Sequence, residues 1–390
     1  MPEARILYVE GNVDGTVGGS YFSLLYLASR LDRSRFRPIV LFAAENELIH
    51  RFRAADIAVM VRRPARPFVI SGWLGRAAGK ALNFLLGWVL EPVRLAALLR
   101  RERVSVVHLN NSIIKNHPWM LAAWVLRIPC VTHERGINPE YLARARLLAR
   151  TQDAIICISG AVRDNMVALG LGKLPLVTIH NGLDPAAMRV TRTVEDIREE
   201  LALDSRRRLV GLVGNLKAWK GQSIVVRALA LLHHEFPDVV CLLIGGASPD
   251  EATFQAALMR LIEEQGLAGS VVWTGYRSDV ANYINALEIQ IHASISPEPF
   301  GRVLLEAMAL AKPLIASSAG GVQEIVVDGE TGLLFEPDNP ASLASRLRTL
   351  LMQPARAAEM GRAGYERLVR SFSIDQHVRE VEALYARILR

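Results

Sequence analysis

Two glutamates, Glu298 and Glu306, flank a short segment whose residue types could bind a phosphorylated ligand. Residues 287–296 before it alternate apolar and polar as a strand does, so Glu298 should lie in a loop at the carboxyl end of a strand. Residues 302–310 are good helix formers, and Gly301 at their start would leave backbone N–H groups free at a positive helix end. Such an end suits a diphosphate, and Glu306, about a turn and a half further on, suits the paired hydroxyls of a ribose. The alternative is a surface helix with two solvated glutamates.

Glycines and a histidine follow predicted strands in the first half of the chain. Residues 11–20 read GNVDGTVGGS, where Gly18 and Gly19 would let the backbone approach a phosphate or a sugar just before a helix. The spacing is not GxGxxG, so dinucleotide binding has little support. His133 ends a short apolar strand and is followed by ERG, which favours a functional position at the floor of a cleft. A structural core histidine is the alternative.

In the second half of the chain, a lysine also follows a predicted strand. A strand-like run at residues 209–214 leads into NLKAWKG, and Lys220 lies just before the next helix. Its ammonium group could there neutralise a diphosphate leaving group as the charge of that group grows. An ordinary solvated loop is the alternative. Two strands further on, the segment TGY ends at Tyr276, where backbone groups could meet the edge of a nucleobase.

The elements that carry these loops alternate along the whole chain. Strand-like runs lie at residues 6–9, 37–42, 104–109, 130–133 and 154–158, and again, after a polar stretch, at 209–214, 239–244, 270–273, 288–292 and 313–316. Alternation of strands and helices predicts α/β domains with parallel sheets. We place two Rossmann-like domains at 1–183 and 184–371, with the last helix, about 372–390, as a candidate to pack back on the first. Two such domains facing across a cleft would gather the carboxyl ends of their strands around a ligand.

Composition limits the class of protein. The 390 residues are enough for two domains, and a hydrophobic content of 51% with a charged content of 22% excludes a disordered chain. Cys130, Cys157 and Cys241 lie in or beside apolar runs without metal-ligand spacing, which indicates buried thiols, a reducing compartment and no zinc site. The apolar run before Glu10 is too short for the centre of a signal peptide and reads as a first strand.

The net charge of +7 is concentrated in one segment. Residues 51–103 contain eleven Arg or Lys and three acids, which gives this segment a charge of +8. Aromatic residues lie among these charges, at Phe68, Trp73, Phe84 and Trp88. The apolar run ALNFLLGWVL at 81–90, stopped by a glutamate and a proline, is too short to span a bilayer, which needs about 20 residues. The segment therefore predicts binding to an anionic membrane surface and not to nucleic acid. A core helix with a solvated basic face is the alternative.

The motifs and their order resemble the retaining, nucleotide-sugar-dependent glycosyltransferases of family 4, which have the two-domain GT-B fold. The resemblance rests on GTVGGS at 15–20, ICIS at 156–159, IHNGLD at 179–184, VGNLKAWKGQ at 213–222, TGYRSDV at 274–280 and EPFGRVLLEAMALAKPLIASSAGGVQEIV at 298–326. It covers nearly the whole chain and is strongest from about residue 209 to 340, where the last block is highly specific.

This resemblance implies roles for individual residues. The catalytic groups would be Glu298 at the donor sugar, Lys220 at the diphosphate and His133 near the transferred sugar. Glu306 would bind the ribose hydroxyls. The remaining donor contacts would come from Gly19 close to the phosphates, Tyr276 at the base through its backbone, and Phe300, Gly301 and Val303 along the sugar and phosphate positions.

Asn215 departs from the family pattern, because the family usually has arginine at this point of the donor site. Loss of that cation should weaken phosphate stabilisation by about 1 to 3 kcal/mol if nothing replaces it. Lys217 and Arg302 are candidate replacements. The departure leaves room for weak activity or for an inactive relative.

We therefore expect transfer of a hexose from a nucleoside diphosphate sugar, UDP- or GDP-linked, with retained anomeric configuration and without a metal or cofactor. The expected acceptor is a lipid-linked or membrane-proximal glycan in cell-envelope polysaccharide synthesis. The expected location is the cytoplasm, at the inner face of the plasma membrane. Two alternatives stay open: a catalytically weakened binding or scaffold protein, and a sugar phosphorylase or nucleotide-sugar epimerase on the same architecture.

Overall fold

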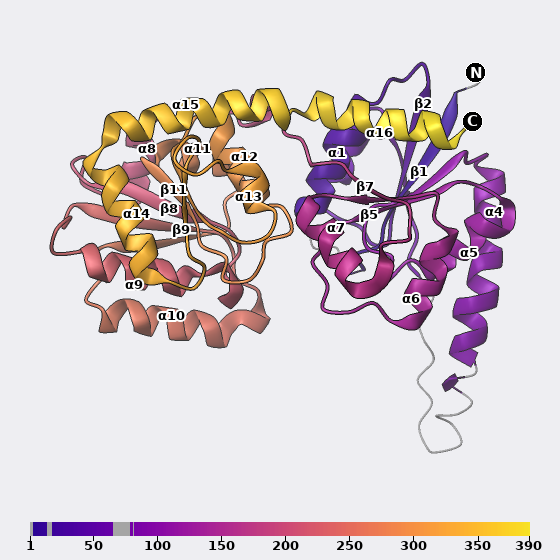
Figure 1. Cartoon of the computed structure of the whole chain (residues 1–390), viewed down its shortest axis with the longest axis horizontal. Coiled ribbons are helices and arrows are strands. Elements are labelled where there is room, and N and C mark those ends of the chain that lie inside the picture. Colours follow the sequence, from indigo (N-terminus) through magenta and orange to yellow (C-terminus); the bar gives the residue numbers. More distant parts are fainter. Residues whose placement is uncertain (1–2, 14–17, 65–78, 81) are drawn as a thin grey trace. The chain divides into compact units, whose positions relative to one another are not determined.

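The computed structural model describes residues 3–13, 18–64, 79–80 and 82–390, and the chain divides into two compact units. Unit 1 comprises Met1–Gly182 and Ile374–Arg390, and unit 2 comprises Leu183–Ser373. Each unit contains one parallel sheet with helices packed against it (Figure 1). The predicted alternation of strands and helices into two α/β domains is confirmed.

The sheet of unit 1 has the strand order β3-β2-β1-β4-β5-β6-β7, with every pairing parallel. Its strands are β1 Ala4–Glu10, β2 Phe36–Phe42, β3 Ala58–Val61, β4 Val106–Leu109, β5 Cys130–Glu134, β6 Ala154–Cys157 and β7 Leu176–Thr178. The central strands β1, β4, β5 and β6 are buried along almost their whole length, as expected where helices cover both faces. The order reverses between β1 and β4, so their carboxyl ends form the usual ligand edge of such a sheet.

Helices of unit 1 surround this sheet, and the C-terminal helix is one of them. They are α1 Gly19–Arg30, α2 Ile49–Ala54, α4 Glu91–Arg101, α5 His117–Leu126, α6 Ala143–Leu148, α7 Gly160–Met166 and α16 Ile374–Ile388. Val378, Val381 and Tyr385 of α16 share one hydrophobic core with β1, β2 and α1. Figure 1 shows α16, in yellow, beside the indigo and magenta elements of this unit.

Unit 2 has the strand order β10-β9-β8-β11-β12-β13, again all parallel. Its strands are β8 Arg208–Val213, β9 Val239–Ile244, β10 Val271–Gly275, β11 Ile289–His292, β12 Leu314–Ser317 and β13 Leu333–Phe335. Its helices are α8 Val194–Glu200, α9 Gln222–Leu232, α10 Ala252–Glu264, α11 Val280–Ala286, α12 Arg302–Ala309, α13 Val322–Ile325, α14 Pro340–Met352 and α15 Pro354–Ser371. Alternate residues of β8 and β9 pack against α9, α10 and α14 on one face and against α8 and α11 on the other.

Three strands were missing from the sequence prediction, namely β3, β7 and β13. All three are edge strands of three or four residues, and β3 and β7 have no fully buried side chain. Short edge strands lack the long apolar run that marks a central strand. The prediction of buried thiols is confirmed, because Cys130, Cys157 and Cys241 are all free and buried.

The apolar segment after residue 81 is longer than the sequence predicted. A helical stretch continues from Leu82 to Arg101. Within it, a π-helical turn at Leu86–Leu90 leads into α4. Pro92 lies in the first turn of α4, where a proline is tolerated. By length and composition this 20-residue stretch is the one candidate to cross a membrane in the described part of the chain, with 22% of its most apolar window buried. The prediction that the segment is too short to span was therefore wrong on length.

Candidate functional site

Lys220 and Glu298, two of the predicted catalytic residues, lie in direct contact at the carboxyl edge of the sheet in unit 2. Lys220 follows β8 and Glu298 follows β11, and these two strands are neighbours. The ammonium Nζ of Lys220 donates to Oε2 of Glu298 over 2.7 Å and lies 4.0 Å from the centre of the Trp219 ring. The sequence placed both residues at the ends of strands, and the structure shows that they form a partly buried ion pair.

Two further residues, His292 and Ser294, complete this group and were missed by the sequence analysis. The hydroxyl of Ser294 donates to Oε2 of Glu298 over 2.8 Å, and Nε2 of His292 lies 3.3 Å from the same oxygen. Burial alone would raise the pKa of Glu298, but the hydrogen bond with His292 and the Lys220 cation outweigh burial and hold this pKa well below its usual range. Glu298 is therefore an ionised hydrogen-bond acceptor near neutral pH and not an acid.

Glycines let the loops of this edge pack against one another. Gly221 has a φ of +73°, and a Cβ atom built on it would lie 1.9 Å from the carbonyl oxygen of Ala293. Gly320 has a φ of +67°, and its Cβ would lie 2.3 Å from the carbonyl oxygen of Glu298. Only glycine fits such positions, because any side chain would overlap the facing backbone. The loops after β8, β11 and β12 are thus held in contact around Lys220 and Glu298.

Helix α12 begins at this edge, as the sequence predicted. Gly301 precedes it with a φ of +97°, a left-handed conformation that favours glycine. The side chain of Phe300 is buried against Phe372, with ring centres 6.1 Å apart, so it is the backbone of Phe300 that could face a ligand. Val303 is half-buried, and its carbonyl accepts from Gln290.

Glu306 lies within this helix and is almost fully buried. The guanidinium of Arg302 donates to Oε1 of Glu306 over 2.7 Å. Arg302, a candidate replacement for the cation missing at Asn215, is thus already engaged with the carboxylate predicted to bind a ribose. Asn215 itself is exposed, and its backbone carbonyl accepts from Gln222.

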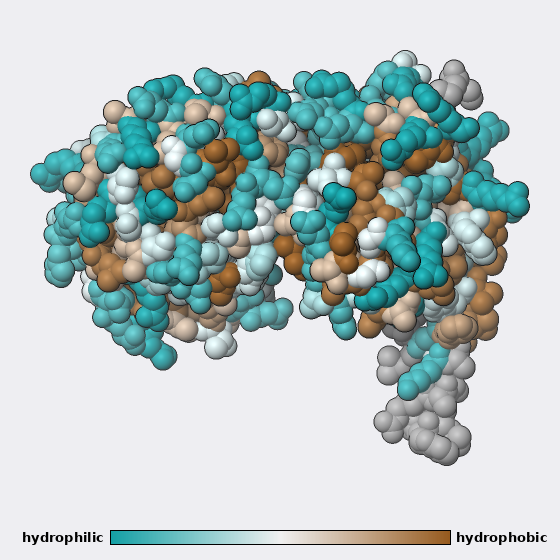
Figure 2. Space-filling model, in the orientation of Figure 1, coloured by the Kyte–Doolittle hydropathy of each residue, from teal (hydrophilic) through white to brown (hydrophobic). Residues whose placement is uncertain are grey.

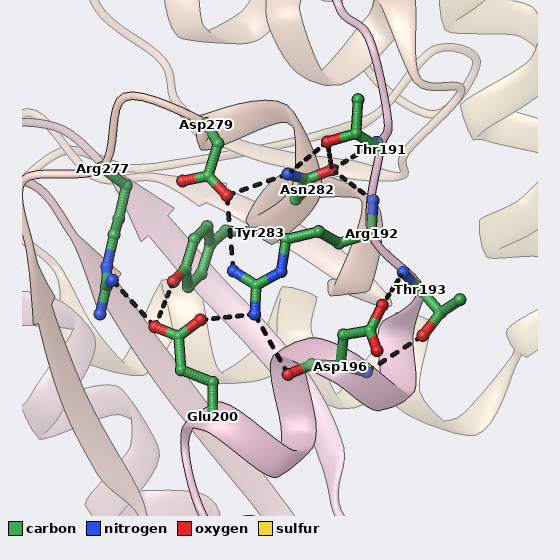
Figure 3. A network of polar contacts seen from close by, with 9 residues as sticks. All are labelled: Thr191, Arg192, Thr193, Asp196, Glu200, Arg277, Asp279, Asn282 and Tyr283. Carbon is green, nitrogen blue, oxygen red and sulfur yellow. Dashed lines mark hydrogen bonds and ion pairs between the residues drawn. The ribbon is translucent and has the colours of Figure 1, made fainter.

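Tyr276, the predicted base contact, is exposed at the end of β10 and precedes a dense polar network. In this network, drawn in Figure 3, Glu200 of α8 accepts from the hydroxyl of Tyr283 and pairs with Arg192 and Arg277 over 2.6 and 2.8 Å. Arg192 also lies 3.5 Å from Asp279. The network fixes the residue after Tyr276 to α8 and α11, and so restrains the loop that would meet a base.

His133 and Gly19 lie at the carboxyl edge of the sheet in unit 1. Gly19 is exposed in the first turn of α1. His133 is the fourth residue of β5 and is fully buried, with Nδ1 2.9 Å from Nε2 of His108. Burial, helped by the nearby Arg135 cation, holds the pKa of His133 well below its usual value, so the ring is neutral at pH 7. Because no part of the ring is exposed, contact with a ligand requires movement of the side chains that cover it.

Glu134, next to His133, gives a testable pH dependence. Burial raises its pKa from 4.5 to about 7, although Ser112, Ile113 and Asn138 donate hydrogen bonds to the carboxylate. The folded state therefore binds a proton more tightly than the unfolded chain, and this group lowers the free energy of unfolding by about 3 kcal/mol as pH rises from 4.5 to 7. We expect the difference in unfolding free energy between Glu134→Gln and wild type, measured with urea, to change across that window. A difference that stays constant with pH would contradict the assignment.

Metal binding has no visible support in the described part of the chain, where no group of three His, Cys, Asp or Glu side chains is placed to hold an ion.

Comparison with known proteins identifies the family. The profile described as glycosyl transferases group 1 matches residues 193–367, and the profile described as glycosyltransferase family 4 matches residues 17–187. The alpha-maltose-1-phosphate synthase of Mycolicibacterium smegmatis is 30% identical over 71% of this chain and 79% of that protein. The chain belongs to the family 4 glycosyltransferases, as the sequence predicted.

Two other relatives are informative. The lipopolysaccharide core biosynthesis mannosyltransferase LpsB of Rhizobium meliloti is 26% identical over 63% of this chain and 69% of that protein. A crystal structure of HepE from Anabaena, in complex with UDP and glucose, superposes with a TM-score of 0.82 at 24% identity and covers 99% of this chain and 100% of HepE. The fold is therefore GT-B, and the predicted fold class of two Rossmann-like domains is confirmed.

Proposed function

We propose that this glycosyltransferase transfers a hexose from a UDP- or GDP-linked sugar, with retention of anomeric configuration, to a lipid-linked or membrane-proximal glycan acceptor in cell-envelope polysaccharide assembly. The observation that carries the proposal is the Lys220–Glu298 pair beside the amino end of α12. A cation and the positive amino end of a helix suit a diphosphate, and an ionised carboxylate suits sugar hydroxyls. The UDP and glucose bound by HepE support this donor class, and the mannosyltransferase activity named for LpsB supports transfer of a hexose.

Charge stabilisation is the main contribution that this site can make to transfer. As the bond between the sugar and the diphosphate breaks, negative charge grows on the leaving phosphate, and the Lys220 ammonium and the amino end of α12 would stabilise it. The Glu298 carboxylate is held by Lys220, Ser294 and His292 and so suits binding of sugar hydroxyls better than nucleophilic attack. We therefore favour attack of the acceptor on the face that the diphosphate leaves, with a diphosphate oxygen taking the acceptor proton. In this scheme Lys220 and α12 do the work for which a divalent metal would otherwise be needed.

Donor turnover separates this function from its alternatives. Wild type and Glu298→Gln would be incubated with UDP- and GDP-hexoses, with and without a membrane extract that contains glycan acceptors. We expect release of nucleoside diphosphate that depends on acceptor and falls at least about 100-fold in Glu298→Gln. Turnover that needs only inorganic phosphate, or only the donor, would indicate a phosphorylase or an epimerase. Donor binding without turnover would indicate the scaffold protein that Asn215 leaves open.

We propose that the first half of the Leu82–Arg101 helix contacts the membrane; it is the part of this surface that the structure describes. Three apolar side chains in this half are exposed, namely Phe84, which is 61% exposed, Leu85 and Val89. Figure 2 shows hydrophobic surface, in brown, at the lower right, over the region of α4 and α5 in Figure 1. Leu95 and Leu99 in the second half are buried. The nine residues Leu82–Leu90 are about 13 Å long, less than half of a hydrocarbon core of about 30 Å. We therefore propose peripheral insertion into one leaflet, at the inner face of the plasma membrane. Phe68 and Trp73 lie outside the described residues.

Vesicle binding tests the membrane contact. The triple variant Phe84→Ser/Leu85→Ser/Val89→Ser should bind phosphatidylglycerol vesicles at least about 100-fold more weakly than wild type in a flotation assay, because three apolar side chains are lost from the bilayer. A matched control replaces Leu231 and Val369, exposed apolar residues of unit 2, with serine and should bind as wild type does. Equal flotation of all three proteins would exclude this helix as the contact.

A further inference from the structure

Trp219 places the face of its ring against the ammonium group of Lys220. The distance from Nζ to the ring centre is 4.0 Å, and the Lys220 side chain is only 20% exposed. An ammonium has three N–H donors, and its one hydrogen-bond acceptor among the described residues is Oε2 of Glu298, 2.7 Å away. The ring is therefore the second partner of this cation, and part of its donor capacity is left for a ligand.

The backbone of Trp219 is fixed between two loops at this edge of the sheet. Its carbonyl accepts from the backbone N–H of Ile295, in the loop after β11, over 2.9 Å. In the loop after β8, Trp219 is the middle residue of a single 3₁₀ turn, Ala218–Lys220. This turn is closed by the backbone N–H of Lys220, which donates to the carbonyl of Lys217 over 2.9 Å. The two loops that carry the ion pair therefore also hold the ring in place.

A ring face and a carboxylate bind the same cation in different ways. The face carries partial negative charge from its π electrons but no net charge, and it attracts a cation most strongly where water is excluded. A diphosphate and the Glu298 carboxylate are both anions, so they repel each other and compete for Lys220. The Trp219 ring does not repel a diphosphate and can keep its contact while the ammonium turns toward the ligand. Of the two partners, the ring is the one suited to both the free and the bound state.

We infer that Trp219 is a positioning residue, which holds the Lys220 ammonium in place through the face of its ring, both before and after a diphosphate binds. The role at a diphosphate rests on the proposed function, whereas the contact between the two side chains does not. A cation that is already in position needs little reorganisation as charge grows on the leaving group. In this scheme Trp219 itself touches neither the sugar nor the phosphates and acts through Lys220.

NMR of the full-length protein labelled with ¹³C-lysine tests the contact without any substrate. Protons over the face of an aromatic ring are shielded, so the two Hε protons of Lys220 should give separate signals shifted upfield. Lys220→Met identifies these signals. Trp219→Leu, which removes the ring, should move them to the averaged position of a solvated lysine, and Trp219→Phe should keep part of the shift. Unshifted, averaged Lys220 signals in the wild type would overturn the inference, whatever the activity of the enzyme.

Fluorination of tryptophan separates the charge of the ring face from the size of the ring. Each fluorine draws electron density from the face and changes the shape of the ring little. The kcat of transfer should therefore fall stepwise from the wild type to proteins made with mono-, di- and trifluorotryptophan. Trp219→Leu should lower kcat about tenfold, the effect of losing one partly desolvated cation–π contact. A purely structural role for Trp219 predicts no stepwise loss with fluorine content.

The matched control is Trp219→Phe made with the same fluorinated tryptophans, because the chain has six tryptophans and all of them are replaced. The kcat of this control should not depend on fluorine content. Equal losses in the control, or no loss in the fluorinated wild type, would overturn the role of Trp219. Shielded, fixed Lys220 protons in a protein that turns over no donor would support the contact and count against the proposed function alone.

Discussion

Replacing Lys220 with methionine should lower kcat by about 100- to 1000-fold, the effect of removing one group that stabilises charge in a transition state. Methionine keeps most of the length and apolar stem of lysine, so packing against Trp219 is largely preserved while the ammonium is lost. Because the charge on the leaving diphosphate grows during bond breaking, the loss should fall on kcat more than on KM. Steady-state kinetics with the preferred nucleotide sugar measure both constants.

The control for this variant is Lys173→Met, which removes an exposed lysine of unit 1 and the same formal charge. It should leave kcat within about twofold of wild type, since an exposed and solvent-screened charge contributes little. A Lys220→Met enzyme with a normal kcat would show that the cation does not stabilise the leaving group. A raised KM alone would assign Lys220 to binding of the donor in its ground state.

Gly221→Ala should be the most destabilising single substitution at the site, with a loss of about 3 to 5 kcal/mol of unfolding free energy. The new methyl group would lie 1.9 Å from the carbonyl oxygen of Ala293, and the φ of +73° adds left-handed strain. The loops after β8 and β11 would have to separate, which also breaks the geometry of Lys220 and Glu298. Calorimetry should show unit 2 melting about 10 °C lower.

Gly266→Ala is a matched control, because Gly266 has a similar φ of +67° but no atom within 4 Å of the position of a Cβ. Its cost should be limited to the backbone strain of about 1 to 2 kcal/mol. The difference in unfolding free energy between the two variants therefore measures the cost of the close contact with Ala293. Equal costs would mean that the loops at the site can move apart freely, and would contradict the tight packing of the loops after β8 and β11.

The sequence predicts the positions of Lys220 and Glu298 because of where parallel strands end. Lys220 and Glu298 each follow a long apolar run, and loops at the carboxyl ends of neighbouring strands must meet. Their direct ion pair could not be predicted, since it depends on loop packing that Gly221 and Gly320 permit. His292 was overlooked because the residues that follow it, ASIS, lack the charged side chains that singled out His133.

No sequence pattern predicts the hydrogen bonds that join Tyr385 to His108 and His108 to His133 in unit 1. Tyr385 meets His108 only because α16 docks on the same face of the sheet as Tyr8, and no local signal in residues 372–390 indicates where that helix packs. The sequence analysis ended the apolar helix at residue 90 and not at Arg101 for a different reason. Pro92 was read as a stop, whereas a proline in the first turn of a helix leaves the hydrogen-bond ladder intact.

The central claim is that a nucleoside diphosphate binds beside Lys220, and a thermal-shift panel tests it most directly. Wild type and Lys220→Met would each be melted with UDP, GDP, ADP and NAD at high excess. Ligand at about 100 times its dissociation constant stabilises a protein by roughly 2.7 kcal/mol. We predict a clear upward shift with UDP or GDP in wild type, a much smaller shift in Lys220→Met, and none with NAD. No shift with any nucleotide, or equal shifts in both proteins, would contradict the claim.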